Sequence, residues 1–140
     1  MQGSAVLDAS TVVALVVPEE YSEWAEERVG RYGDLHVLDL TRYEAYNALW
    51  KKHVMLGEIG REALKEAVRV VDALLEVCSV HRFEIVKERA LEIAVGCRVT
   101  VYDAAYLALA EHINGVLVTI DTKLRDRLRS TELERIVAAP

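Results

Sequence analysis

Four acidic residues stand in or beside apolar stretches of this 140-residue chain, where they could do chemistry together. Asp8 and Asp121 each follow a short apolar run, whereas Glu44 and Asp103 lie inside "YEAYNAL" and "VYDAAYLALA". Carboxylates that are brought together repel one another unless they are protonated or bridged by a cation. A set of oxygen ligands suits Mg²⁺ or Mn²⁺ rather than zinc. Such ions can activate water and polarise a phosphoryl oxygen, so the chemistry indicated is metal-dependent hydrolysis of a phosphodiester.

Short apolar runs alternate with helix-like stretches, which is the pattern of an α/β domain with a parallel sheet. The expected strands are residues 4–8, 35–40, 78–81, 116–120 and, at one edge of the sheet, 135–138. The expected helices are residues 10–17, 19–32, 41–56, 61–77, 83–96 and 103–112, and residues 122–131 form a short basic helix or loop. Residues 1–140 fit one domain. We therefore expect a short central parallel sheet flanked by helices on both faces.

This order of elements brings the four acids to one edge of the sheet. The carboxyl ends of parallel strands share an edge, and that edge is the usual site of an open α/β sheet. Asp8 and Asp121 end two of the expected strands. A helix that leads into a parallel strand begins at the same edge, which places Asp103 and Glu44 there as well. The sequence therefore predicts that the four carboxylates converge.

Helix capping is the simpler interpretation of each acid taken alone. Asp is a favoured N-cap residue, so Asp103 and Asp121 could each cap the helix that follows. Glu44 completes "TRYE", which has the form of a capping box with Thr41. Ser10 could cap the first helix and leave Asp8 as a turn residue. Capping explains each acid but does not predict that all four meet.

The overall composition limits the classes of partner and compartment. The formal net charge of −6 argues against a broad basic surface that holds duplex DNA non-specifically, although a local basic patch can still bind nucleic acid. Cys78 and Cys97 have no zinc-site spacing, and we expect them to be buried thiols rather than a disulfide. The four histidines are scattered and read as structural or exposed. The first residues lack a signal or membrane segment, so we expect a cytoplasmic protein with no membrane association.

The stretches "AVLDAS", "YEAYNAL", "VYDAAYLALA" and "GVLVTIDTKL", in this order and spacing, resemble the PIN-domain family. Within that family the whole chain is similar to the VapC-type toxin ribonucleases of VapBC toxin–antitoxin pairs. The resemblance implies a single PIN-like domain, Mg²⁺- or Mn²⁺-dependent endoribonuclease activity, a homodimer and a VapB-type antitoxin as partner. It also implies metal-binding and catalytic roles for Asp8, Glu44, Asp103 and Asp121. The supporting polar residues implied by the resemblance are Ser10, Asn47 and Thr119.

Binding of RNA also requires basic residues to neutralise its phosphates. Candidates follow the last acid directly, at Lys123, Arg125, Arg127 and Arg129. Such a charge run can equally be a solvated helix face. Lys51 and Lys52 are weaker candidates. Four tyrosine and tryptophan residues could stack on bases, but their helical spacing is more typical of a core or an interface: Tyr43, Tyr46, Trp50 and Tyr106.

Two other classes of function compete with a toxin nuclease. A non-catalytic regulatory or binding module, such as a receiver-like phospho-acceptor, also gathers acids at a sheet edge. A receiver would need an acid pair after its first strand, whereas Ala9 follows Asp8 here. Nucleotide binding lacks its glycine-rich motifs. A PIN-domain enzyme of RNA processing, without an antitoxin, is the other alternative.

Overall fold

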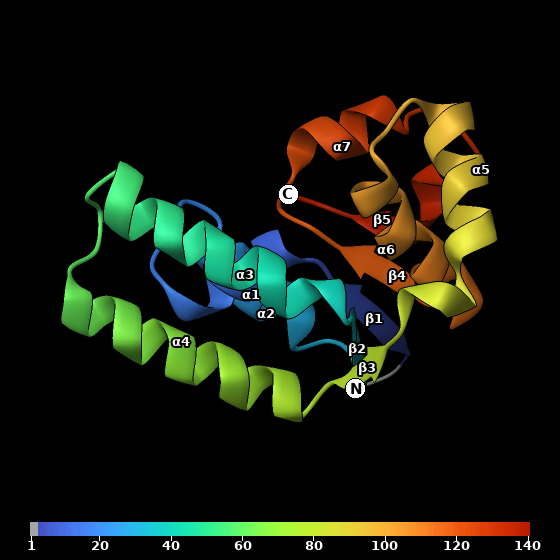
Figure 1. Cartoon of the computed structure of the whole chain (residues 1–140). Coiled ribbons are helices and arrows are strands. Elements are labelled where there is room, and N and C mark those ends of the chain that lie inside the picture. The colour runs from blue at the N-terminus through green and yellow to red at the C-terminus, as the bar shows by residue number, and fades with distance from the viewer. Residues whose placement is uncertain (1–2) are drawn as a thin grey trace.

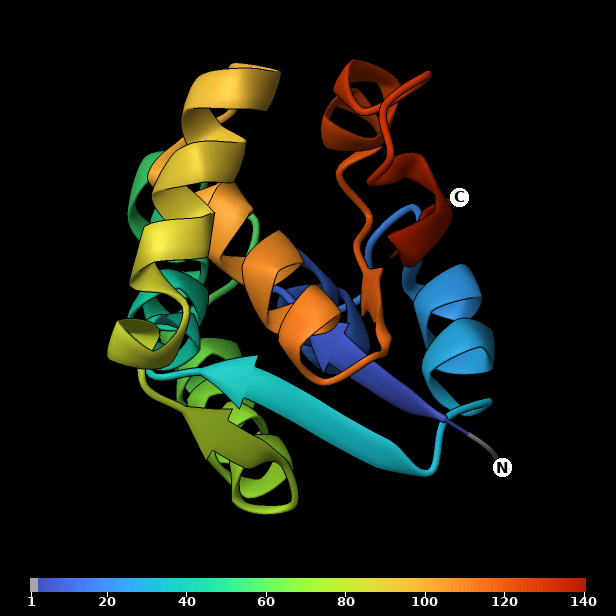
Figure 2. The same ribbon diagram turned by 90° about the vertical axis from the view of Figure 1, so that its right-hand side faces the viewer.

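Five parallel strands form one sheet in the computed structural model, which describes residues 3–140. The strands are β1 (Ser4–Leu7), β2 (Asp34–Leu38), β3 (Ser79–His81), β4 (Val116–Val118) and β5 (Val137–Ala138), in the spatial order β3-β2-β1-β4-β5. β1 lies in the middle, with Ala5 paired with Leu35 on one side and with Val116 on the other. Figure 2 shows β1 and β2 pointing the same way. The predicted parallel α/β fold is confirmed.

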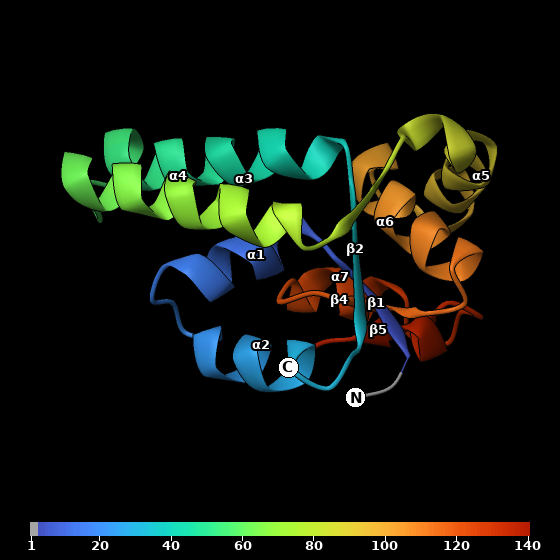
Figure 3. The same cartoon turned by 90° about the horizontal axis from the view of Figure 1, so that it is seen from below.

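Helices cover both faces of this sheet. They are α1 (Ala9–Val16), α2 (Ser22–Val29), α3 (Leu40–Trp50), α4 (Arg61–Glu76), α5 (Lys87–Cys97), α6 (Val101–His112) and α7 (Thr122–Arg127). Figure 1 shows α1–α4 on one side of the sheet and α5–α7 on the other, and α3 and α4 lie side by side (Figure 3). Within residues 3–140, no single helix is long and apolar enough to cross a membrane, and α5 and α6 meet that test only together, as a pair bent by 119°.

The central strands are buried on both faces, and successive residues therefore belong to different cores. Val6 packs in the core formed with α5, α6 and α7, whereas Leu7 packs in the core formed with α1, α3 and α4. Leu117 and Val118 of β4 divide between the two cores in the same way. Burial of both faces explains why these strands appear in the sequence as continuous apolar runs rather than as alternating ones. The carboxyl edge that carries the candidate site therefore lies at the ends of strands that are packed on both faces.

Several predicted boundaries were wrong. Residues 39 and 40, expected in a strand, form the N-cap and the first residue of α3, which a π-helical segment, Lys51–Met55, continues. The helix predicted over residues 83–96 is divided into a 3₁₀ turn, Phe83–Ile85, and α5. That helix does not stop at Gly96, because the left-handed residue that ends it is Arg98, with φ of 57°.

Candidate active site

Two of the four acids cap helices at the carboxyl edge of the sheet. Asp8 is the N-cap of α1 and accepts a hydrogen bond from the Thr11 amide at 2.9 Å. Asp121 is the N-cap of α7 and accepts one from the Leu124 amide at 3.0 Å. Capping by Asp121 was one of the interpretations open from sequence, whereas capping of α1 by Ser10 was wrong. Both carboxylates therefore cap a helix and also lie at the carboxyl edge of the sheet.

The other two acids do not cap. Thr100, not Asp103, is the N-cap of α6, and its hydroxyl accepts the Asp103 amide at 3.1 Å. Asp103 is thus the third residue of the helix. The predicted capping box of Thr41 and Glu44 is also absent, since α3 begins at Leu40 and Thr41 is fully buried. Capping accounts for neither the Asp103 nor the Glu44 carboxylate.

Thr119 links the acids of the two central strands. This threonine follows β4 and is fully buried. Its hydroxyl donates a hydrogen bond to Asp8 Oδ2 and accepts one from the Asp121 amide at 3.0 Å. Ser10 donates to the other oxygen of Asp8 at 2.7 Å. The two hydroxyls predicted from the resemblance therefore hold one carboxylate in a fixed orientation.

Tyr106 fixes Glu44 from across the site. Its hydroxyl donates to Glu44 Oε1 at 2.7 Å and lies 3.0 Å from Thr41 Oγ1. Thr41 in turn accepts the Leu38 amide at 3.1 Å, which ties the network to the end of β2. Helical spacing indicated a core role for Tyr106 and did not predict this contact. Its spacing of three residues from Asp103 on one helix was the available signal.

Electrostatics show that the four acids face a common region. The pKa of Asp103 is raised to about 6 by burial and, in decreasing order, by the charges of Asp121, Asp8 and Glu44, against a hydrogen bond with Thr100. Burial raises the pKa of Glu44, against the Tyr106 hydrogen bond and with a contribution from Asp8. Burial also raises the pKa of Asp8, opposed by its hydrogen bonds from Thr119, Ser10 and Thr11. The predicted convergence is visible in this mutual repulsion.

The donor set is made of carboxylate and hydroxyl oxygens, which fits Mg²⁺ or Mn²⁺. Among residues 3–140, however, no three Asp, Glu, His or Cys side chains form a ready-made metal site. The chemistry of the four carboxylates and their neighbouring hydroxyls nevertheless fits a divalent cation.

A cavity of about 260 Å³ brings basic side chains to two of the acids. Asp103 and Asp121 line it together with Arg98, Lys123 and Arg127. Arg127 also donates to the Arg98 carbonyl at 3.1 Å. Arg98 was missed in the sequence because it stands outside the basic run, and the left-handed turn after α5 brings it there.

The other predicted basic candidates lie outside this cavity. Arg125 and Arg129 both form ion pairs with Asp126, each at 3.2 Å. Lys52 is paired with Glu19 at 2.9 Å and with Glu58 at 3.2 Å, whereas Lys51 is exposed. The basic run is therefore divided between a part that lines the cavity and a part that pairs with Asp126 outside it.

The remaining predictions have mixed outcomes. Asn47 lies on the exposed surface of α3, one turn beyond Glu44. Tyr106 is in the core, as helical spacing suggested, whereas the other three aromatics are exposed: Tyr43, Tyr46 and Trp50.

The cysteines depart from expectation, whereas a contact between two of the histidines fits the structural role expected of them. Cys78 and Cys97 are both free and half-buried rather than fully buried, and burial raises the pKa of Cys78 to about 11. His36 and His81 are not independent, because their ring nitrogens lie 2.8 Å apart between β2 and β3.

Comparison with known proteins gives one family and close relatives. Residues 5–128 match the model of the PIN domain. The chain is 42% identical over 122 residues to "Ribonuclease VapC3" of Pyrobaculum aerophilum, which spans 87% of this chain and 92% of the relative. It is 34% identical over 119 residues to "Exonuclease VapC9" of the same organism, which spans 85% of this chain and 81% of that relative.

Solved structures give the same fold. PAE2754 from Pyrobaculum aerophilum is 32% identical with a TM-score of 0.66, over 96% of this chain and 89% of that one. A chain of a toxin–antitoxin complex from Klebsiella pneumoniae is 15% identical with a TM-score of 0.69, over 96% and 95% of the two chains. At 15% identity, the likeness to the Klebsiella pneumoniae chain is one of fold alone.

Proposed function

The chain belongs to the PIN-domain family, and from that premise we propose that it is a Mg²⁺- or Mn²⁺-dependent endoribonuclease and the toxin of a VapBC-type pair. The nuclease class follows the names of its two curated relatives. One observation carries the catalytic assignment: Asp103 lines a cavity together with Asp121, and burial and then the charges of Asp121, Asp8 and Glu44 raise its pKa. An acid without a capping role, held against like charges, is a candidate functional group.

Asp8, Glu44, Asp103 and Asp121 are the residues that would hold the cation. A bound divalent ion would polarise the phosphoryl oxygen and stabilise the leaving oxygen. Asp8 is held by Thr119 and Ser10, and Glu44 by Tyr106, so two of the four are oriented before substrate arrives. Orientation of this kind lowers the cost of reaching the reactive geometry.

Asp103 is the residue we assign to proton transfer, through the carboxylate oxygen that does not hold the cation. It lines the cavity that holds Lys123 and Arg127. In the proposed reaction, a water oxygen attacks phosphorus and gives its proton to the Asp103 carboxylate. The bond from phosphorus to the leaving oxygen then breaks, and the leaving oxygen takes up a proton from solvent water.

Lys123, Arg127 and Arg98 supply positive charge beside these acids. The proposed RNA phosphates bind in this cavity, where three cations offset part of the repulsion between phosphate and carboxylate. Arg125 and Arg129 share one carboxylate, Asp126, which offsets part of their charge, and they do not line the cavity, so we assign them a smaller share of RNA binding. We propose a cytoplasmic location, where cellular RNA is available as substrate.

A VapB-type antitoxin and a homodimer complete the proposal. Both relatives carry VapC names, and a chain of the same fold occurs in a toxin–antitoxin complex. Large apolar side chains exposed at the end of α3 offer surface for protein contacts: Trp50, Val54 and Met55. A short neighbouring reading frame that encodes a DNA-binding antitoxin would support the toxin role. Its absence would favour an RNA-processing enzyme of the same family.

A circular RNA library tests the activity, because only an endonuclease can open a circle. Wild type with Mn²⁺ or Mg²⁺ should linearise circularised random-sequence RNA, and chelation of the metal should stop it. Asp103→Asn should lose the activity, whereas Glu76→Gln, an exposed acid on α4, should keep it. Cleavage of linear RNA from its ends with circles left intact would instead support an exonuclease, the activity named for one relative.

A further inference from the structure

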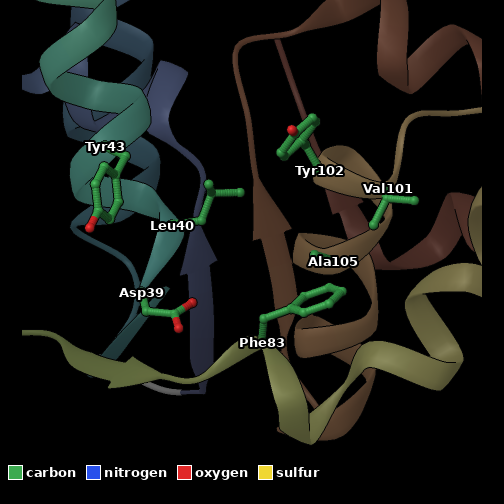
Figure 4. Close-up of a pocket in the computed structure, with 7 residues that line it drawn as sticks. All are labelled: Asp39, Leu40, Tyr43, Phe83, Val101, Tyr102 and Ala105. Atoms are coloured by element: carbon green, nitrogen blue, oxygen red, sulfur yellow. The ribbon is translucent and has the colours of Figure 1, made fainter.

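A second, larger cavity of about 780 Å³ lies between the beginnings of α3 and α6. Asp39, Leu40 and Tyr43 line one wall, and Phe83, Val101, Tyr102 and Ala105 line the other (Figure 4). This volume is within the range of about 300–1,000 Å³ that is typical of pockets for small ligands. No basic side chain lines it. A phosphate would therefore find no counter-charge in this cavity.

The aromatic side chains of this cavity are exposed although they are large. Tyr43 is 79% exposed and Tyr102 is 59% exposed, one on each wall. Phe83 adds a third ring, half-buried at the base of α5. Exposed aromatic rings are the groups on which unpaired nucleic acid bases stack, whatever the base.

The cavity adjoins the candidate active site through two pairs of neighbouring residues. Tyr43 precedes Glu44 in α3, and Tyr102 precedes Asp103 in α6. The first turn of α6 separates the two cavities, since Asp103 lines the smaller one and Tyr102 the larger. A nucleotide whose phosphate lies by Asp103 would therefore have its base within reach of the aromatic cavity.

Asp39 gives this cavity a polar group that the fold does not use. It occupies the N-cap position of α3, yet its side chain makes no capping hydrogen bond. Within residues 3–140 its carboxylate has no ion pair and no side-chain hydrogen bond, and Figure 4 shows it turned toward the space between the two walls. A carboxylate accepts a hydrogen bond from an exocyclic amino group such as N4 of cytosine. Uracil has no exocyclic amino group, and its one ring donor, N3–H, lies between two carbonyl oxygens that repel a carboxylate.

We propose that this cavity binds an unpaired base of the RNA substrate, next to the phosphate that is cut, with Tyr43 and Tyr102 as its stacking surface and Asp39 as its selector. The inference rests on the proposed nuclease function and extends it to recognition of sequence. Asp39 favours a base that carries an amino group and disfavours uracil at this position. Phosphate contacts in the smaller cavity position the strand, and this base contact specifies it.

Sequencing of cleavage products from a random-sequence RNA pool tests the proposal. Tyr43→Ala and Tyr102→Ala should each lower kcat/KM by about 5- to 150-fold and flatten the base preference at one position beside the cut. Tyr43→Phe and Tyr102→Phe keep the ring and should retain both rate and preference. Asp39→Asn, which adds a donor beside the acceptor oxygen, should raise the share of uracil at that same position. Ala variants that cleave with the wild-type rate and preference would overturn the proposal.

Sedimentation of the same variants separates base binding from a protein contact. Wild type and both Ala variants should have the same oligomeric state. If Tyr43→Ala dissociates an oligomer and lowers cleavage equally for every sequence, the cavity is covered by a second copy of the chain and the proposal is wrong. If wild type cleaves no RNA at all, the nuclease assignment fails. If wild type cleaves and the Asp39 and tyrosine variants match it, the base-binding proposal alone fails.

Discussion

Replacement of Asp103 by Asn should stabilise the protein without metal, and the gain should depend on pH. The folded pKa of this carboxyl is raised from 3.8 to about 6, so the folded state binds its proton more tightly than the unfolded chain does. Between these pH values the unfolding free energy must fall as pH rises. Ionised Asp103 therefore costs stability above about pH 6 and costs nothing below about pH 4.

The size of this effect follows from the same pKa. A change from 3.8 to about 6 corresponds to about 3 kcal/mol, at roughly 1.36 kcal/mol per pKa unit. Asp103 is partly accessible to solvent, which screens the charges around it. We therefore expect Asp103→Asn to gain about 1–2 kcal/mol at pH 7.5. At pH 4 the variant and the wild type should be equally stable.

Urea unfolding in the presence of a chelator, at pH 4 and at pH 7.5, measures this difference. Glu76→Gln is the matched control, because it removes one exposed acid far from the site and should change stability little at either pH. The reasoning is refuted if Asp103→Asn is less stable than wild type at pH 7.5. It is equally refuted if any gain is the same at both pH values.

Three further perturbations test other parts of the structure. Tyr106→Phe removes the hydroxyl that orients Glu44, so the unfolding free energy in urea should fall by about 1 kcal/mol. The rate of RNA cleavage should fall by a larger factor than this loss of stability explains. An unchanged cleavage rate would show that the contact does not orient Glu44 for catalysis. Gly115→Ala places a Cβ 2.4 Å from the Ser4 carbonyl oxygen of β1 and should lower Tm markedly, whereas Gly96→Ala, where a Cβ meets nothing within 4 Å, should hold or raise it. In an Asp103→Asn background, Lys123→Gln with Arg127→Gln should reduce the slope of log RNA affinity against log salt concentration by about 1.4. Arg125→Gln with Arg129→Gln should leave this slope nearly unchanged. Equal effects of the two pairs would show that the cavity does not bind phosphate.

The sequence was sufficient for the fold because the patterns that specify it are local and strong. β1 and β4 are buried on both faces, so their runs of apolar residues stand out from the amphipathic helices. Their parallel order then places Asp8 and Asp121 at one edge. That part of the site is a consequence of chain order alone.

Finer features depend on competing local preferences, such as two candidate N-cap residues for one helix, and a single sequence does not show which preference prevails. Thr100 and Asp103 are both good N-cap residues, and the left-handed turn at Arg98 decides that the helix begins at Val101. The strand expected to reach residue 120 ends at Val118, because its partner β5 ends there and the Thr119 hydroxyl turns to Asp8. The contact of Tyr106 with Glu44 was not predictable for a similar reason. Its position among apolar residues indicated a core side chain and gave no sign that its hydroxyl donates a hydrogen bond to Glu44.

The central claim is that the converging acids hold a divalent cation, and calorimetric titration with Mn²⁺ tests it most directly. The titration uses wild type, Asp103→Asn and the Glu76→Gln control at pH 6, near the pKa of Asp103. Wild type and the control should bind Mn²⁺ and release protons as the metal displaces them from the acids, and Asp103→Asn should bind more weakly with less proton release. Equal affinity and equal proton release in all three proteins would place the cation elsewhere and contradict the account.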